Sequence, residues 1–185
     1  MNSPTLSRCF SYLGENGISY SHSLHATAKG VHGFSAPTGI PLCDIAFTVL
    51  YHGDNQYGML VLPADRMIEF WSALDFRQVR ELMGLRQIRL SSGLELASLF
   101  PHCAVSAVPP FGSLFDMPIL LDRELAMTNV MRFAIGTSRD VICMSTTDFM
   151  TLVQPVVGSF SGRANPSRAM HAETMHAVWK SHAAA

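Results

Sequence analysis

The spacing of apolar residues is typical of β-strands in some stretches of the chain and of α-helices in others. Residues 44–52 and 57–63 are apolar on both faces and flank the polar stretch 53–56, which predicts a hairpin at the centre of a sheet. Shorter apolar runs predict further strands at 18–24, 87–90, 117–122, 130–135 and 140–144. Helical spacing, together with a capping box of Ser91 or Ser92 with Glu95, predicts helices at 4–15, 66–74, 76–82, 92–100 and 145–153. We therefore expect an α+β fold, a single domain with a mixed central β-sheet surrounded by helices.

The composition changes after residue 157. Gly and Ser residues in 158–163 are typical of a linker, and Asn165 followed by Pro166 is a favourable start for a helix. An apolar stripe extends that helix over 165–181. We therefore expect a domain over 1–157 and, over 158–185, a linker with a C-terminal helical extension. The extension either docks on the domain, packs on a partner or a second copy of the chain, or stays disordered.

The overall composition is that of a compact globular protein. Of the 185 residues, 48% are hydrophobic and 15% are charged, and the formal net charge is −1. Such a chain is not disordered throughout, and it has no overall positive charge that would attract nucleic acid. RNA binding would therefore need a local basic face, and we expect no DNA partner.

The sequence shows neither a membrane segment nor a disulfide pattern. No apolar run approaches the roughly 18–20 residues of a membrane span, and residues 1–17 lack a basic region followed by an apolar one. Cys9, Cys43, Cys103 and Cys143 form no Cys-x-x-Cys pair. We therefore expect a cytoplasmic protein with free thiols and no membrane partner.

The densest combination of stiff and flexible residues lies between residues 101 and 122. Pro109 and Pro110 fix φ, and Gly112 permits a turn that a Cβ would block. Residues 119–121 are an apolar run suited to a buried strand. This stretch predicts a rigid, shaped loop that leads into the sheet. From the residues alone it is either a functional loop or a surface connection between two elements.

Residues 101–122 also resemble the signature of the YbaK-type aminoacyl-tRNA deacylases, which include the editing domain inserted in bacterial prolyl-tRNA synthetases. The family pattern is close to Gly-x-x-x-Pro, then Pro-Phe-Gly, then an apolar strand that ends in Asp, here Asp122. The similarity continues in order at 45–50, 59–65, 133–137 and 147–155. It implies the fold of these editing domains and hydrolysis, in trans, of the ester bond of mischarged tRNA, bound by its acceptor end.

The resemblance implies a site as well. Residues 106–112 would shape a pocket for the scissile carbonyl, Gly136 and Thr137 would form its opposite wall, and Phe47 would line its floor. The substrate-binding positions that the resemblance implies are His25, Phe47, Ser106, Ala107, Val108, Pro109, Pro110, Phe111, Gly112, Gly136, Thr137 and Ser138. In the family the reaction depends on backbone groups that position the carbonyl, on the substrate's ribose hydroxyl and on a strand Lys. No metal and no organic cofactor is implied.

Four positions depart from the family pattern. Phe47 stands where the family has its Lys, and Ser106 stands where it has the leading Gly of the loop. Ala134 and Ser138 stand where Asn and His are common. The catalytic residue is therefore left open. Two hypotheses remain: a deacylase with an altered pocket, or a non-catalytic descendant that binds tRNA, a nucleotide or a protein partner.

Two weaker patterns remain. His22 and His25 could bind a metal only with further ligands to which nothing in the sequence points, so a position at the surface or at the rim of a pocket is the simpler interpretation. The densest basic group consists of Arg77, Arg80, Arg86 and Arg89. This group predicts either a local patch for the tRNA backbone or, because acidic residues are interspersed, a mixed solvated face.

Overall fold

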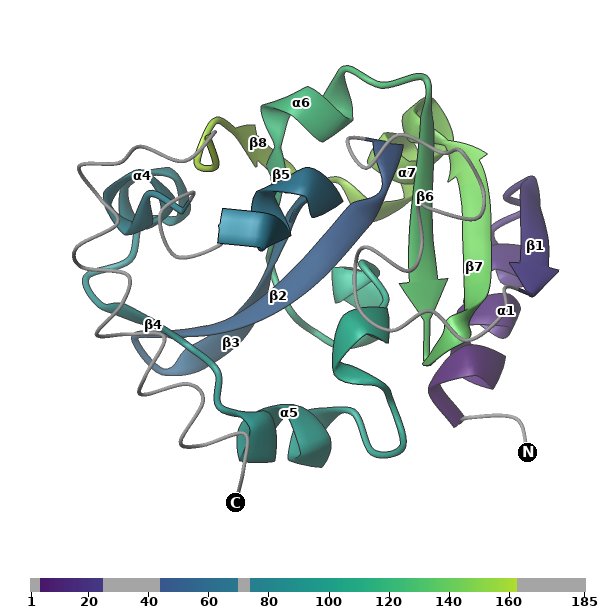
Figure 1. Ribbon diagram of the computed structural model, residues 1–185, viewed down its shortest axis with the longest axis horizontal. Coiled ribbons are helices and arrows are strands. Elements are labelled where there is room, and N and C mark those ends of the chain that lie inside the picture. Colours follow the sequence, from purple (N-terminus) through teal and green to yellow (C-terminus); the bar gives the residue numbers. More distant parts are fainter. Residues whose placement is uncertain (1–3, 25–43, 70–73, 163–185) are drawn as a thin grey trace.

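The computed structural model describes residues 4–24, 44–69 and 74–162 (Figure 1). In chain order its helices and strands are α1 (Pro4–Glu15), β1 (Tyr20–Leu24), β2 (Ala46–Gly53), β3 (Gln56–Pro63), the 3-10 helix η2 (Ala64–Glu69), α4 (Phe76–Met83), β4 (Ile88–Leu90), α5 (Gly93–Leu99), the 3-10 helices η3 (Val105–Ala107) and η4 (Gly112–Leu114), β5 (Ile119–Asp122), α6 (Arg123–Ala126), β6 (Val130–Ile135), β7 (Thr137–Ser145), α7 (Thr146–Val153) and β8 (Val156–Gly158). The predicted α+β fold is confirmed.

The strands of the described residues form two sheets. The larger has the order β4-β2-β3-β5-β8, with the antiparallel hairpin β2–β3 inside it and parallel pairing of β3 with β5 and of β5 with β8. The smaller is antiparallel, with the order β1-β7-β6. A single parallel bridge between Ile45 and Arg132 joins the two. The expected mixed sheet with a central hairpin is therefore present. Three of the predicted strands, β1, β6 and β7, form a second sheet, which the sequence pattern did not indicate.

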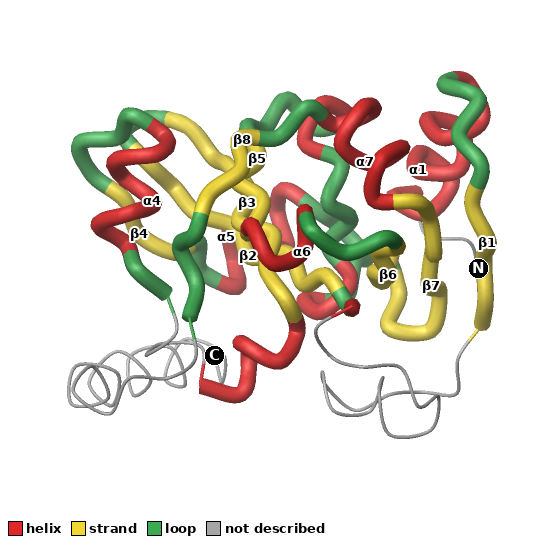
Figure 2. Tube along the Cα trace, turned by 90° about the horizontal axis from the view of Figure 1, so that it is seen from above, coloured by secondary structure: helices red, strands yellow, loops and turns green. Residues whose placement is uncertain are grey.

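The main core lies where the two sheets meet. Helices α1 and α7 lie on one side of the small sheet (Figure 2), and apolar residues of α1, β6, β7 and α7 pack there with those of β2, β3 and β5. At its centre the ring of Phe111 is 5.4 Å from that of Phe133 and 6.4 Å from that of Phe149. A second cluster, which includes Tyr51 and Val79, packs α4 on the large sheet. The hairpin is therefore buried on both faces, as its uniformly apolar strands predict.

Helix ends follow from local chemistry. The Ser92 hydroxyl accepts the Glu95 N–H at 3.3 Å, and the Ser92 N–H donates to the Glu95 carboxylate at 2.8 Å, so the predicted capping box of α5 is confirmed. Asp75 caps the start of α4, and Gly84, at φ +66°, ends it. The stretch predicted as a helix over 66–74 begins instead as the 3-10 helix η2, and residues 70–73 lie outside the described part.

The segment after α7 continues the large sheet. Gly158 pairs with Asp122 at the end of β8, and the Asp122 carboxylate accepts the Ser161 hydroxyl at 2.7 Å and the Ser161 N–H at 3.1 Å. The Phe160 side chain is buried. Packing therefore continues into the stretch that we expected to be a linker, whereas the helix predicted over 165–181 lies outside the described residues. None of the helices within the described ranges is long and apolar enough to cross a bilayer.

Candidate functional site

The loop between α5 and β5 is folded into two tight turns. His102 and Asp116 both have left-handed backbone, at φ +62° and +56°. The Gly112 carbonyl accepts the N–H groups of Phe115 and Met117, each at 2.9 Å. A Cβ on Gly112 would lie only 2.1 Å from the Met117 carbonyl oxygen. The turn therefore requires glycine because the backbone passes too close for a side chain, as the sequence predicts.

The middle of the loop is anchored in the core. All four residues 108–111 are buried, and Val108 and Phe111 belong to the main apolar cluster. Their side chains hold the loop in place and face the interior of the domain.

Helix α1 fixes the outer part of the same loop, a contact that sequence reasoning missed. Arg8 donates to the Leu114 carbonyl at 2.8 Å, and its guanidinium lies 4.9 Å from the centre of the Phe115 ring. The Tyr12 hydroxyl lies 2.5 Å from that of Ser113. Because these residues are about 100 positions apart along the chain, no local pattern signals the contact.

The start of the loop meets the turn between β6 and β7. The Gly136 N–H donates to the Ala107 carbonyl at 2.8 Å, and the Ala104 N–H donates to the Gly136 carbonyl at 3.0 Å. Gly136 itself has φ +70°, which favours glycine. Two backbone hydrogen bonds therefore hold η3, which contains half-buried Ser106, directly against Gly136. These are two of the segments that we expected to face a common site.

Small apolar side chains lie beneath this junction. A buried cluster joins Ala107 to Ala134, Val141, Ala64 and Ile45. Alternation along β2 places the partly exposed Phe47 on the same face as Ile45, two residues earlier.

Phe47 pairs directly with Leu62 of β3, which also belongs to that face of the large sheet. The family's Lys position is therefore occupied by an aromatic ring on β2, the strand that begins just after Ile45, and Ile45 shares an apolar cluster with Ala107 of η3. His25 lies outside the described residues.

The hydroxyl of Thr137 is engaged within its own turn. It accepts the N–H groups of Arg139 at 3.2 Å and Asp140 at 3.1 Å, and it donates to the Asp140 carboxylate. Asp140 is buried and also accepts a hydrogen bond from His22 Nε2 at 2.9 Å. Thr137 therefore contributes to the turn, while its neighbour Ser138 is half-buried.

Sequence reasoning missed Asp140, and for His22 it weighed a metal site against a position at the surface or at the rim of a pocket. In the structure the partner of His22 is this carboxylate. Within the described ranges no three His, Cys, Asp or Glu side chains come together in a way that could hold a metal ion.

Two thiols lie below the loop in their neutral form. The Cys103 S–H donates to the Ala107 carbonyl at 3.3 Å, and burial raises the pKa of Cys103 to about 11. Burial raises the pKa of Cys9 to about 12. Neither is a thiolate near neutral pH, so neither is a ready nucleophile. Both thiols are free, as expected.

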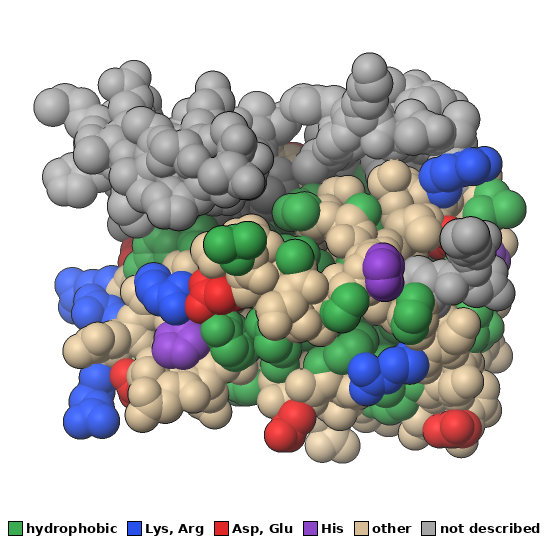
Figure 3. Space-filling model, turned by 90° about the horizontal axis from the view of Figure 1, so that it is seen from below, with side chains coloured by type: hydrophobic (Ala, Val, Ile, Leu, Met, Phe, Trp, Pro, Cys, Tyr) green, Lys and Arg blue, Asp and Glu red, His purple; other side chains and the backbone are tan. Residues whose placement is uncertain are grey.

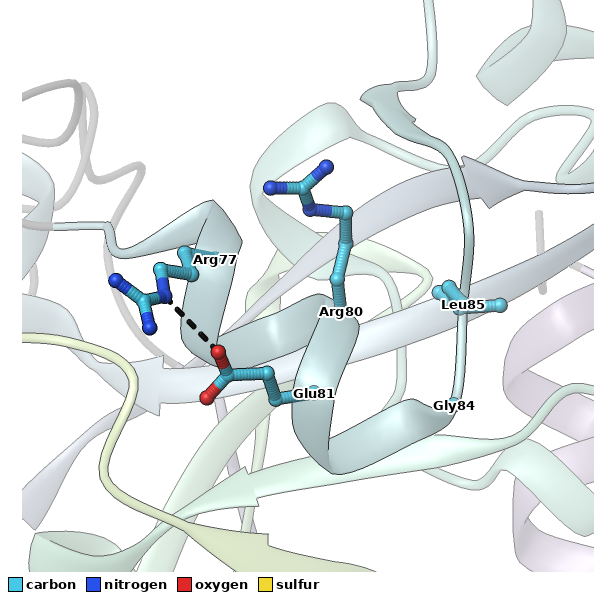
Figure 4. A pocket seen from close by; sticks show the side chains of 5 residues that line it. All are labelled: Arg77, Arg80, Glu81, Gly84 and Leu85. Atoms are coloured by element: carbon cyan, nitrogen blue, oxygen red, sulfur yellow. Dashed lines mark hydrogen bonds and ion pairs between the residues drawn. The ribbon is translucent and has the colours of Figure 1, made fainter.

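Two of the four arginines of the basic group, Arg77 on α4 and Arg89 on β4, are paired with carboxylates. Arg77 bonds Glu81 at 2.9 Å, and Arg89 bonds Glu95 at 2.6 Å. A hollow of about 360 Å³ is lined by Arg77, Arg80, Glu81, Gly84 and Leu85. In Figure 4 the Arg80 guanidinium points away from the Arg77–Glu81 pair. Basic side chains are also dispersed among acidic and apolar ones on the face in Figure 3, so the arrangement favours a mixed solvated face.

The comparison with protein families agrees with this geometry. The sequence model of the aminoacyl-tRNA editing domain matches residues 25–152, which contain η3, the Gly136 turn and the strand that carries Phe47. The chain therefore belongs to the aminoacyl-tRNA editing domain family. No curated protein sequence matches it significantly.

Solved structures show the same fold at low sequence identity. A candidate trans-editing enzyme for prolyl-tRNA synthetase has a TM-score of 0.71 at 19% identity, over 88% of this chain and 99% of the other. A hypothetical protein has a TM-score of 0.72 at 18% identity, over 84% and 99%. A scaffold protein from computational epitope grafting has a TM-score of 0.71 at 19% identity, over 87% and 99%. At these identities the similarity establishes the fold alone.

Proposed function

We propose that the protein is an aminoacyl-tRNA deacylase that hydrolyses the ester bond of mischarged tRNA in trans. The observation that carries the proposal is the pair of hydrogen bonds between η3 and Gly136 in a chain of the editing domain family. They join two segments that the family resemblance assigns to the site, and this supports the proposal. The substrate would be the acceptor end of an aminoacyl-tRNA, and the reaction would take place in the cytoplasm.

The chemistry requires a positioned water, a held carbonyl and stabilisation of the oxyanion. Water would attack the ester carbon, and collapse of the tetrahedral intermediate would release the amino acid and the ribose hydroxyl of tRNA. Cys9 and Cys103 are neutral thiols, and Thr137 is bonded to Asp140. Backbone groups around Ser106 are therefore the best candidates to hold the carbonyl, with help from the substrate's own ribose hydroxyl.

The residues around the junction suit an uncharged aminoacyl group. The cluster beneath η3 contains only small and aliphatic side chains, and Phe47 adds an aromatic ring where the family has a cation. We therefore propose Phe47, Ser106 and Ala107 as contacts of the substrate, with Gly136 opposite them.

The direct test measures release of amino acid from a panel of mischarged tRNAs. Alanyl-, seryl-, cysteinyl- and threonyl-tRNA are each incubated with the folded protein and, as control, with buffer alone. Turnover above the buffer rate on any of them supports the deacylase and names its substrate class. Release at the buffer rate from all four tRNAs contradicts the deacylase.

A non-catalytic binding protein is the second candidate, favoured by the aromatic ring at position 47. If loss of the Lys abolished catalysis, Phe47→Lys should create hydrolysis that the wild type lacks. Phe47→Leu is the matched control because it removes the ring and adds no charge. A gain in both variants would mean that space, and not the ammonium group, is what the site needs.

A further inference from the structure

The turn between β6 and β7 is shaped by a side chain. The β6–β7 register shifts at Ala134 and Ile135, so regular strand pairing is interrupted just before Gly136. Beyond it, the Asp140 carboxylate accepts the Thr137 hydroxyl, and the same hydroxyl accepts the Asp140 N–H at 3.1 Å. This closed pair of bonds defines the path of the chain from Thr137 to Asp140.

A second strand holds the carboxylate from the other side. His22 of the edge strand β1 bonds Asp140 through Nε2 at 2.9 Å, and its ring meets Phe10 of α1 edge-on at 5.0 Å. Asp140 is only 8% exposed, whereas His22 stands on the exposed strand β1, so the carboxylate is covered and its bond to His22 is partly buried. The carboxylate therefore has a defined position relative to both strands.

These bonds continue without a break to the candidate site. His22 is bonded to Asp140, Asp140 is bonded to Thr137, and Gly136 directly precedes Thr137 in the chain. Gly136 exchanges both of its backbone hydrogen bonds with the segment 104–107. Between Thr137, which is bonded to Asp140, and the segment 104–107 there is thus only one residue of backbone, Gly136.

We propose that Asp140, held by His22, is a positioning residue for the hydrolytic site. It sets the conformation of the Gly136–Thr137 turn and, through Gly136, the placement of η3 against the substrate. The proposal rests on the proposed deacylase function for its catalytic consequence. Its structural consequence, the coupling of Asp140 to the amides of Ala104 and Gly136, can be measured without any substrate.

The test compares Asp140→Ala with Asp54→Ala by amide hydrogen exchange and by kinetics. Asp54 is a matched control because its carboxylate also holds two partners, the N–H groups of Arg86 at 3.3 Å and Gln87 at 3.0 Å, on the hairpin turn of the large sheet. In Asp140→Ala the Ala104 and Gly136 amides should exchange at least about tenfold faster, whereas in Asp54→Ala they should not change. His22→Ala, on an exposed strand, is the milder variant if Asp140→Ala folds poorly.

The kinetic arm separates positioning from general stability. On the tRNA that wild type hydrolyses, Asp140→Ala should lower kcat by up to about 100-fold with little change in KM, because a misplaced η3 affects the reacting carbonyl more than tRNA binding. Asp140→Asn, which keeps an acceptor for Thr137, should restore most of the rate.

Each outcome decides between the two proposals. Unchanged exchange at Ala104 and Gly136, or unchanged kcat in a variant with faster exchange, overturns the positioning role. Faster exchange in a protein whose wild type hydrolyses none of the tRNA panel supports the coupling and overturns the deacylase.

Discussion

Replacing Gly112 by Ala tests whether the loop is as tightly closed as its contacts indicate. The added Cβ would lie 2.1 Å from the Met117 carbonyl oxygen and 2.6 Å from Cγ1 of Ile119. Ordinary contacts of this kind are about 3.4 Å or longer, so the backbone at Met117 or at Gly112 must move by about 1 Å. The Met117 N–H donates to the Gly112 carbonyl at 2.9 Å, and such a movement would break this hydrogen bond.

The expected cost of Gly112→Ala is about 2–3 kcal/mol of unfolding free energy, typical of overpacking at a site that cannot relax. For a domain of this size that corresponds to a fall in melting temperature of roughly 4–12 °C. Thermal unfolding followed by circular dichroism measures it. Gly14→Ala in α1 is the matched control, because its Cβ would have no neighbour within 4 Å and alanine favours the helix. If both variants melt at or above the wild-type temperature, the close approach is not real.

Two further changes test buried and paired groups. Among the described residues, the buried hydroxyl of Tyr51 has no hydrogen-bond partner, and burial raises its pKa to about 12. Tyr51→Phe should therefore leave urea stability unchanged or raise it by up to about 1 kcal/mol, and a loss larger than that would reveal a partner. The Arg89 guanidinium lowers the pKa of Glu95, so their bond stabilises the fold above the unfolded pKa of about 4.3 and less as pH falls. Because Arg89 is half exposed, Glu95→Gln should lower the free energy of unfolding by only about 1 kcal/mol at pH 7, a figure that includes the part of Glu95 in the helix cap. This difference in stability from the wild type should become smaller by pH 3. A difference that stays constant with pH would refute the ionic contribution.

Local patterns in the sequence predicted the larger elements of the fold well. The bounds of α1 and the hairpin β2–β3 depend on apolar spacing, helix caps and a polar turn, all of which are written in neighbouring residues. The four residues of α6 and the three of β8 were missed. Asp122 supplies the reason, because its carboxylate caps α6 and binds Ser161, so both segments depend on a buried contact made by the folded chain.

The candidate site, too, was predicted from the sequence only in part. Family resemblance indicated that Ser106 and Gly136 share a site, and their segments are hydrogen-bonded to each other in the structure. The contact between His22 and Asp140 was not predicted, since the two residues are 118 positions apart and neither belongs to a motif. Division of the strands into two sheets escaped prediction for a related reason. A strand's periodicity indicates which face is buried but not which strand it pairs with.

Strand β8 has a practical consequence for anyone who wishes to express the domain. A chain shortened after residue 157, where the composition changes, would lack Phe160, which is 1% exposed and packs beside α4. The vacated volume would cost about 3–5 kcal/mol by analogy with Phe→Ala changes in protein cores. The loss of Gly158 and Ser161 would also leave the far side of β5 partly bare, and an unprotected edge of this kind invites strands of other molecules to add to it. Recombinant versions that keep residues up to at least 162 should therefore be the soluble ones.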